Sequence, residues 1–366
     1  MIPLIKPDLP FSEIANDIQK ILESGRLTGG PYVRDFEDAF SNYIGVTYAI
    51  ATTSATTALH MTLVGRGIGP GDEVLVSDFT FPASGNTIVQ TGATPVLVDC
   101  MPDSFELDLN TARSLVTENT KGLMVVHPFG QPVNLTSLHQ FGKETGIWIL
   151  EDAACAVAAH NAGVKCGAMG NAAAFSFHPR KILTTGEGGM ITTNSGELAE
   201  RLAVLRAHGG QPNSVGLRFM ENGFNYRMSE IQAAMGLVQL ARIESIVQER
   251  RRIARLYLTR LSALDSLSTP MCAPDSECSF QSFVVLLADG IDRNRVILKM
   301  KESGIETTIG TYAMHAHPAF SRFGYAPGDL HHAWVAQEQS LTLPLFAGMS
   351  EEDIDHIVRT LSRLTQ

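Results

Sequence analysis

The sequence is poor in cysteine and has no spacing typical of a metal or disulfide site. Its 366 residues include five cysteines, an odd number, and no two of them have C-x-x-C spacing. This usage predicts a reducing compartment and argues against a disulfide framework or a zinc site. His315 and His317 alternate as they would on one face of a strand, but no third ligand accompanies them, so we expect no metal. The cysteines are Cys100, Cys155, Cys166, Cys272 and Cys278.

Concentrated positive charge and long apolar runs are also missing. The formal net charge is −10, and the largest basic cluster is Arg250–Arg252, so nucleic acid is not an expected partner. No apolar run is long enough to span a bilayer, and no signal-peptide pattern is present. We therefore expect a cytoplasmic protein with no membrane partner.

One enzyme class is excluded by the spacing of the glycines. Nicotinamide-dependent oxidoreductases carry G-x-G-x-x-G directly after their first strand. The glycine run from Gly65 to Gly71 has a different spacing and follows a helical pattern. We therefore reject a dinucleotide-binding turn, although strands and helices alternate in this chain as they do in that class.

Short apolar runs alternate with helical patterns through the first 240 residues. This alternation predicts an α/β fold in which helices flank both faces of a mostly parallel sheet. From Ala241 to Leu264, apolar residues recur at helical spacing, which predicts one long amphipathic helix. We interpret that helix as the bridge from a large domain, residues 1–240, to a smaller C-terminal α+β domain, residues 241–366.

The stretch from Gly146 to Gly189 carries the strongest chemical signal. An apolar run, Ile147–Leu150, ends in Glu151-Asp152. This is the pattern of a buried parallel strand with a carboxylate at its carboxyl end, where open α/β sheets place their ligands. Ser176 and Lys181 follow on a predicted turn.

A carboxylate, a hydroxyl and an amine in this order are what pyridoxal phosphate chemistry needs. The lysine amine forms a Schiff base with the cofactor aldehyde and later shuttles protons, while the aspartate keeps the pyridine nitrogen protonated. We predict Lys181 and Asp152 as catalytic and Ser176 as a phosphate ligand. Taken singly, Lys181 is more typical of a surface lysine and Asp152 of a helix cap; their combination in this order is what indicates the cofactor.

A second predicted phosphate contact lies at the start of a helix. Thr52 to Thr57 is rich in hydroxyl groups and opens a helical pattern. A helix N-terminus presents free N–H groups and the positive end of the dipole, so it favours anions. We expect the backbone amides of Thr56 and Thr57 to bind the phosphate; the alternative is an ordinary N-cap by Ser54.

In these motifs the chain resembles the DegT/DnrJ/EryC1/StrS family of sugar aminotransferases, which have the aspartate aminotransferase fold (fold type I). The resemblance implies a seven-stranded sheet in the large domain. The matching motifs, each given with its first residue, follow in order over most of the chain: L-T-G-G-P-Y-V at Leu27, S-A-T-T-A-L-H at Ser54, G-I-G-P-G-D-E-V at Gly67, F-T-F at Phe79, F-G-Q-P at Phe129, E-D-A-A at Glu151, S-F-H-P-R-K at Ser176, T-G-E-G-G at Thr185 and N-Y-R-M at Asn225.

The resemblance also implies roles for further residues. Phe81 would stack on the cofactor ring, and Asn225 would reach the cofactor phosphate of a neighbouring subunit. Cys155 stands where the family commonly has Gln, and it is either a weak partner of the ring oxygen or a small buried residue. Gly29 lies in a turn near the family's substrate site. His178 and Arg180 flank the lysine and either can touch substrate. Arg227 is a candidate for a donor carboxylate, with a structural ion pair as an equal alternative.

The family's chemistry sets the expected function. It implies a homodimer with composite active sites, L-glutamate as amino donor and a nucleotide-linked 4-keto-6-deoxyhexose as acceptor, in the biosynthesis of amino sugars for surface polysaccharides or antibiotics. Alternatives are a keto sugar without a nucleotide, a cyclitol, or a non-catalytic regulatory member of the fold. Dehydratases of this fold replace the Schiff-base lysine with His, so Lys181 argues against them.

Overall fold

A seven-stranded sheet forms the centre of the computed structural model, which describes residues 1–366. Five neighbouring strands are parallel, and β10 alone runs against the others. The mostly parallel seven-stranded sheet expected from the sequence is therefore confirmed. The strand order is β1 (Tyr48–Thr52), β10 (Gly189–Thr193), β9 (Ala172–Ser176), β6 (Trp148–Asp152), β5 (Thr120–Val126), β2 (Glu73–Ser77) and β4 (Thr94–Val98).

Helices cover both faces of this sheet, because alternate side chains of each strand enter two different apolar cores. Leu75 lies in one core, whereas Val74 and Val76 lie in the other. The first core is completed by α2 (Pro31–Ile44), α5 (Leu109–Ser114), α6 (Leu135–Thr145) and α8 (Glu230–Leu240). The second is completed by α3 (Ala55–Arg66), α4 (Ala83–Gln90) and α7 (Gly196–Arg206).

The C-terminal part has its own core around a second sheet. All pairs in this sheet are antiparallel, and the buried residues of its core lie between Ile253 and Leu361. A short break at 241–242 separates α8 from α9 (Ile243–Leu261), in line with a boundary near 241, which stays a prediction. The sheet contains β13 (Leu267–Ser268), β15 (Phe283–Leu287), β18 (Ser340–Leu343) and β16 (Thr308–Ile309), packed with α9, α10 (Arg293–Glu302) and α12 (Glu351–Thr365).

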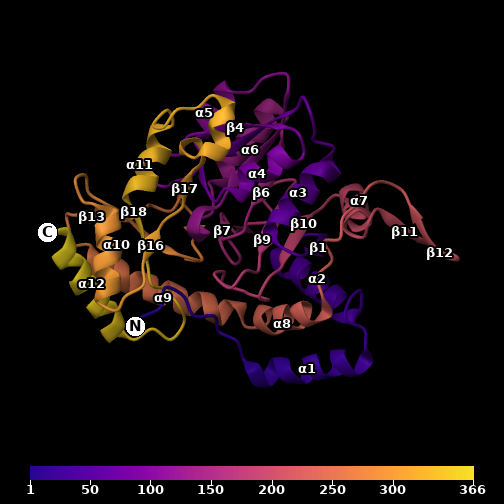
Figure 1. Cartoon of the computed structure of the whole chain (residues 1–366), viewed down its shortest axis with the longest axis horizontal. Coiled ribbons are helices and arrows are strands. Elements are labelled where there is room, and N and C mark those ends of the chain that lie inside the picture. Colours follow the sequence, from indigo (N-terminus) through magenta and orange to yellow (C-terminus); the bar gives the residue numbers. More distant parts are fainter.

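Two segments cross between the parts of the chain. Ile2 pairs with Ile305, so the N-terminal residues lie against the C-terminal part, although the predicted boundaries count them with the first domain. In the other direction, β17 (Tyr312–Ala313) pairs with β3 (Phe79–Thr80). Figure 1 shows α8 and α9 in sequence along one side of the molecule, with the N-terminus near α9 and α12.

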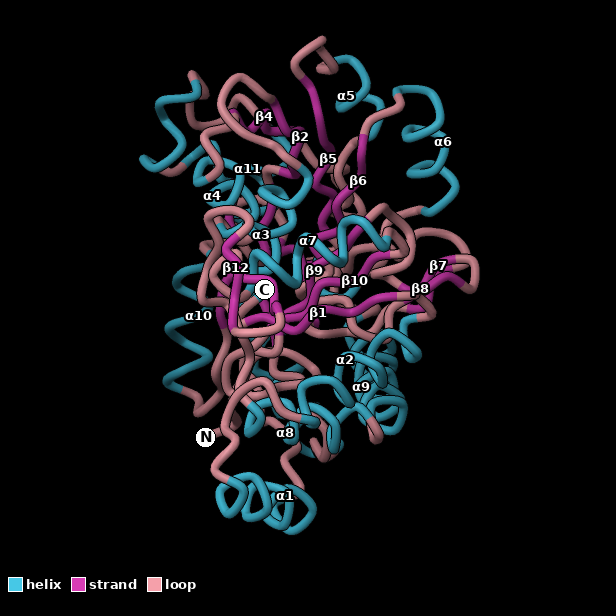
Figure 2. Tube along the Cα trace, turned by 90° about the vertical axis from the view of Figure 1, so that its right-hand side faces the viewer, coloured by secondary structure: helices cyan, strands magenta, loops and turns pink.

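Two elements project from the body. Helix α1 (Phe11–Ser24) packs on α8 and stands away from the central sheet in Figure 2. The hairpin of β11 (Gly210–Asn213) and β12 (Gly216–Phe219) extends beyond α7 in Figure 1. No helix combines the length and apolar character needed to cross a membrane.

Two expectations about the C-terminal half need correction. Cys272 and Cys278 form a disulfide, because the turn at β14 (Ser276–Glu277) brings them together. Strand β14 pairs with β7 (His160–Asn161), and β7 pairs with β8 (Val164–Lys165). The histidine pair does not lie on a strand: His315 is in the 3-10 turn η2 (Met314–Ala316), and His317 directly follows it. As a result, His315 bonds Asp78 while His317 bonds Gln337. The remaining elements are η1 (Pro128–Gly130), η3 (Pro318–Phe323) and α11 (His331–Gln339).

Candidate active site

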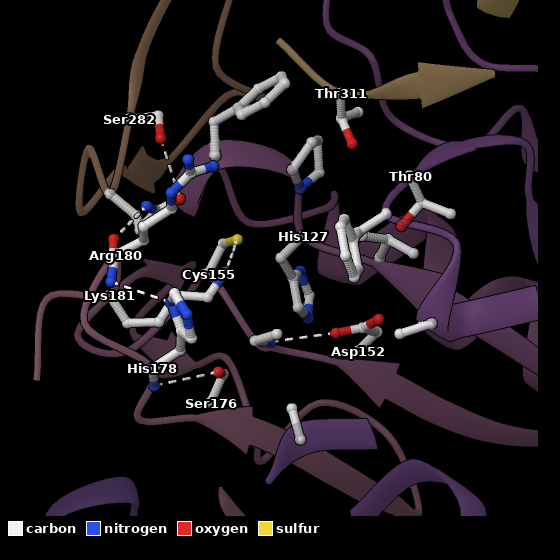
Figure 3. Close-up of a pocket in the computed structure, with 18 of the residues that line it drawn as sticks. Thr80, His127, Asp152, Cys155, Ser176, His178, Arg180, Lys181, Ser282 and Thr311 are labelled. Carbon is white, nitrogen blue, oxygen red and sulfur yellow. Dashed lines mark hydrogen bonds between the residues drawn. The ribbon is translucent and has the colours of Figure 1, made fainter. Parts of the chain in front are cut away.

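A cavity of about 590 Å³ opens where the carboxyl ends of β6 and β9 meet the N-terminus of α3 and segments of the C-terminal part. This volume suits a small-molecule ligand. Figure 3 shows Lys181, His178 and Ser176 on one side of it and Asp152 and Thr80 on the other. Eight of the residues predicted from the sequence line it: Thr56, Phe81, Asp152, Cys155, Ser176, His178, Arg180 and Lys181.

Asp152 lies at the carboxyl end of β6 and is held in place by two donors. The Ser84 hydroxyl donates to Oδ2 at 2.7 Å, and the Ala154 N–H donates to Oδ1 at 3.1 Å. Its side chain is almost fully buried at the cavity wall. Ser84 comes from α4, and no motif in the sequence pointed to it.

The neighbouring Glu151 points to the opposite face of the strand. Its carboxylate accepts three backbone N–H groups of segment 167–170, at 2.7 to 2.8 Å. His127 Nε2 also donates to it, because His127 Nδ1 is occupied as the acceptor of the Val133 N–H. Both side chains are fully buried, so Glu151 holds the loop after β8 rather than a ligand.

Lys181 follows β9 on a tight turn and directs its amine into the cavity. The amine donates to Cys155 Sγ at 3.0 Å. Cys155 is therefore a half-buried wall residue in contact with the lysine. Burial lowers the pKa of His178. The positive charges of Lys181 and Arg180 lower it as well, whereas the carboxylate of Glu187 raises it; the net shift is downward, so the imidazole is neutral at pH 7.

The N-terminus of α3 presents two unused N–H groups to the cavity. Ser54 forms a capping box, and its hydroxyl accepts the Thr57 N–H at 3.1 Å. The expectation that the Thr57 amide is free is therefore wrong, whereas those of Ala55 and Thr56 have no acceptor in the chain. A Cβ at Gly189 would lie 2.4 Å from the Ser54 carbonyl carbon, so this close approach of β10 to the helix requires glycine.

These groups fit pyridoxal phosphate. Free N–H groups at a helix N-terminus, with the Ser176 hydroxyl beside them, suit a phosphate. A buried carboxylate, Asp152, and an amine, Lys181, are present in the same cavity. The Phe81 ring is 65% exposed, which leaves a face free for stacking.

Besides Thr57, three predicted residues lie outside the cavity of their own chain. Gly29 occupies a turn at φ 65°, and the N–H of the next residue is held by the buried Glu230. Asn225 is exposed and pairs through its backbone with Ala207. Arg227 does not line the cavity either. The chain on its own therefore gives these three residues no contact with Lys181.

The comparisons with known proteins agree with this geometry. A model of the DegT/DnrJ/EryC1/StrS aminotransferase family matches residues 11–362. GDP-perosamine synthase of Caulobacter vibrioides is 41% identical over 338 residues, which is 92% of this chain and 90% of that protein. The spore coat polysaccharide biosynthesis protein SpsC of Bacillus subtilis is 35% identical, over 96% of each chain.

Solved structures are equally similar. DesV of S. venezuelae, in complex with a ketimine intermediate, superposes with a TM-score of 0.94 at 32% identity, covering 100% of this chain and 98% of that one. Spr1654 of Streptococcus pneumoniae, a candidate sugar aminotransferase in its PLP form, gives 0.94 at 28% identity, covering 100% of this chain and 98% of that one. The fold type I expectation is thereby confirmed, and the chain belongs to the DegT/DnrJ/EryC1/StrS family of pyridoxal-phosphate-dependent aminotransferases.

Proposed function

We propose that this protein transfers the amino group of L-glutamate to a nucleotide-linked keto sugar, with a 4-keto-6-deoxyhexose as the expected acceptor. The observation that carries the proposal is the convergence of Lys181, Asp152 and Ser176 on one cavity with the open N-terminus of α3. The similarity to GDP-perosamine synthase supports an acceptor with a nucleotide, and that to SpsC supports a role in polysaccharide biosynthesis.

Each residue has a defined task in this reaction. Pyridoxal phosphate, when bound, supplies an electron sink that stabilises negative charge on the carbon that loses its proton. The Ala55 and Thr56 amides and the Ser176 hydroxyl would hold its phosphate, and Asp152, oriented by Ser84, would pair with its ring nitrogen. The Lys181 amine would carry the cofactor and then move the proton between donor and cofactor carbons.

A homodimer with composite sites is part of the proposal. Asn225 lies outside its own cavity, between two residues whose stacked rings pack on His60 and leave the amide exposed. The nearby hairpin carries an apolar group that the chain itself does not cover: Val215, Leu217, Phe219 and Met220. Both features support a homodimer in which a second copy of the chain covers the hairpin and Asn225 reaches the cavity of that copy.

The absorbance spectrum of the protein reconstituted with pyridoxal phosphate tests the proposal. We expect a band near the visible edge that moves to shorter wavelength when L-glutamate is added, and amination of a GDP- or other nucleotide-linked keto sugar afterwards. Lys181→Ala should lose the band, while Lys143→Ala, an exposed lysine, should keep it. No band at all would contradict the aminotransferase function; a band indifferent to glutamate would contradict the donor.

A further inference from the structure

The backbone of Arg180 is fixed on both sides while its guanidinium has no partner. Its N–H donates to His178 Nδ1 at 3.1 Å, and its carbonyl accepts from Gln281 Nε2 at 2.7 Å. The side chain lines the cavity but forms no hydrogen bond or ion pair within the chain. In Figure 3 it lies beside Lys181 and Ser282, across the cavity from Thr80 and Thr311.

The position of Arg180 depends on a second, buried arginine. Arg250 donates to the carbonyls of Phe280 and Gln281, at 2.9 and 2.7 Å, and burial lowers the pKa of its guanidinium to about 9. These bonds hold Gln281, whose amide in turn holds the Arg180 carbonyl. The chain thus uses Arg250 of α9, Gln281 of the loop before β15 and His178 of the turn after β9 to present one unpaired guanidinium.

Arg180 is also the one uncommitted permanent cation of the cavity. Lys181 contacts Cys155 and is assigned to the cofactor, and His178 is neutral at pH 7. The carboxylates of the cavity wall, Asp152 and Glu187, form no ion pair with Arg180. The chain has a net charge of −10, so the guanidinium of Arg180 is the complementary positive charge that this cavity offers to an anionic ligand.

We propose that Arg180 is an anion-binding residue for the substrates. Its planar guanidinium binds the carboxylate of the amino donor or the diphosphate of the nucleotide-linked acceptor. The inference rests on the proposed function, because both half-reactions use Lys181 and each substrate must occupy this cavity in turn. A guanidinium presents parallel N–H donors that match carboxylate and phosphate oxygens in two-point contact. One free guanidinium can therefore receive either anion.

Binding without turnover provides the first test. Calorimetric titration of the reconstituted holoenzyme with glutarate and with inorganic diphosphate measures each anion separately. Arg180→Gln should weaken at least one of them roughly 10–100-fold, the loss expected for charge-assisted hydrogen bonds. Arg180→Lys should fall between, because it keeps the charge but loses the fork. Arg255→Gln, an exposed arginine of α9 without a partner, should match the wild type.

Steady-state kinetics then assign the anion. A fall in kcat/KM for glutamate alone assigns the carboxylate, a fall for the keto sugar alone assigns the diphosphate, and a fall for both assigns a shared site. Unchanged binding of both probes and unchanged kcat/KM in Arg180→Gln would overturn the proposal. Failure of the proposed function is seen separately, since wild-type protein would then not respond to glutamate whatever residue 180 is.

Discussion

The Ser84 hydroxyl donates a 2.7 Å hydrogen bond to the Asp152 carboxylate, and Thr80 Oγ1 lies 3.0 Å from the same hydroxyl. All three side chains are almost fully buried, and those of Asp152 and Thr80 line the cavity. A carboxylate that must face the ring nitrogen of a cofactor is thereby fixed in one rotamer. Ser84 is a positioning residue, which acts through Asp152.

We predict that Ser84→Ala slows the half-reaction with L-glutamate about 10-fold or more, the value of a hydrogen bond to a charged group. Cofactor affinity should fall as well, measured by equilibrium dialysis of pyridoxal phosphate. Ser41→Ala, another buried serine but outside the cavity, is the control for losing a hydroxyl. If the two variants behave alike, Ser84 does not position Asp152.

Glu151 is predicted to govern stability. Its carboxylate accepts backbone N–H groups from segment 167–170 and the His127 Nε2–H in a fully buried site. We expect Glu151→Gln to lower the free energy of unfolding by about 3–5 kcal/mol, as when one partner of a buried charged network is removed. Denaturant titration measures it. The exposed Glu200→Gln should change it by less than about 0.5 kcal/mol; equal effects would refute the assignment.

His60 predicts a pH dependence of stability. Burial against Phe224 and Tyr226 lowers its pKa in the folded protein, so the neutral form is favoured there. Its contribution is complete above the unfolded pKa, about 6.5, and is lost as the pH falls through that value towards the lower folded pKa. Unfolding measured between pH 8 and 5 should therefore show a smaller loss in His60→Gln than in wild type. The exposed His332→Gln should keep the wild-type slope.

Subunit mixing tests the composite site. Lys181→Ala and Asn225→Ala should each be inactive, yet a refolded mixture should recover activity at about one quarter of its sites, since half the dimers are hybrids with one intact site. Lys181→Ala mixed with Asp152→Ala should recover none, because both residues line the cavity of one chain. Failure of the first mixture would mean that Asn225 does not serve a neighbouring subunit.

The chemistry of the site was predictable because it depends on residue types at short spacing. Asp152 and Ser176 end the neighbouring parallel strands β6 and β9, and Lys181 follows β9. The carboxyl ends of such strands meet at one edge of the sheet. The family's sequence motifs around these residues indicated the same cavity. The disulfide between Cys272 and Cys278 escaped prediction, because pairing depends on a turn that the spacing does not encode.

By itself, the sequence determined the alternation of strands and helices, the family, and which residues to expect at a cofactor site, since periodicity and local motifs are enough for these. The tertiary structure alone decided which of two adjacent carboxylates faces the cavity, because strand pleating sends Asp152 and Glu151 to opposite faces. It also committed the Thr57 amide to Ser54 and left the Arg180 guanidinium without a partner. Those outcomes depend on neighbours brought together only by folding.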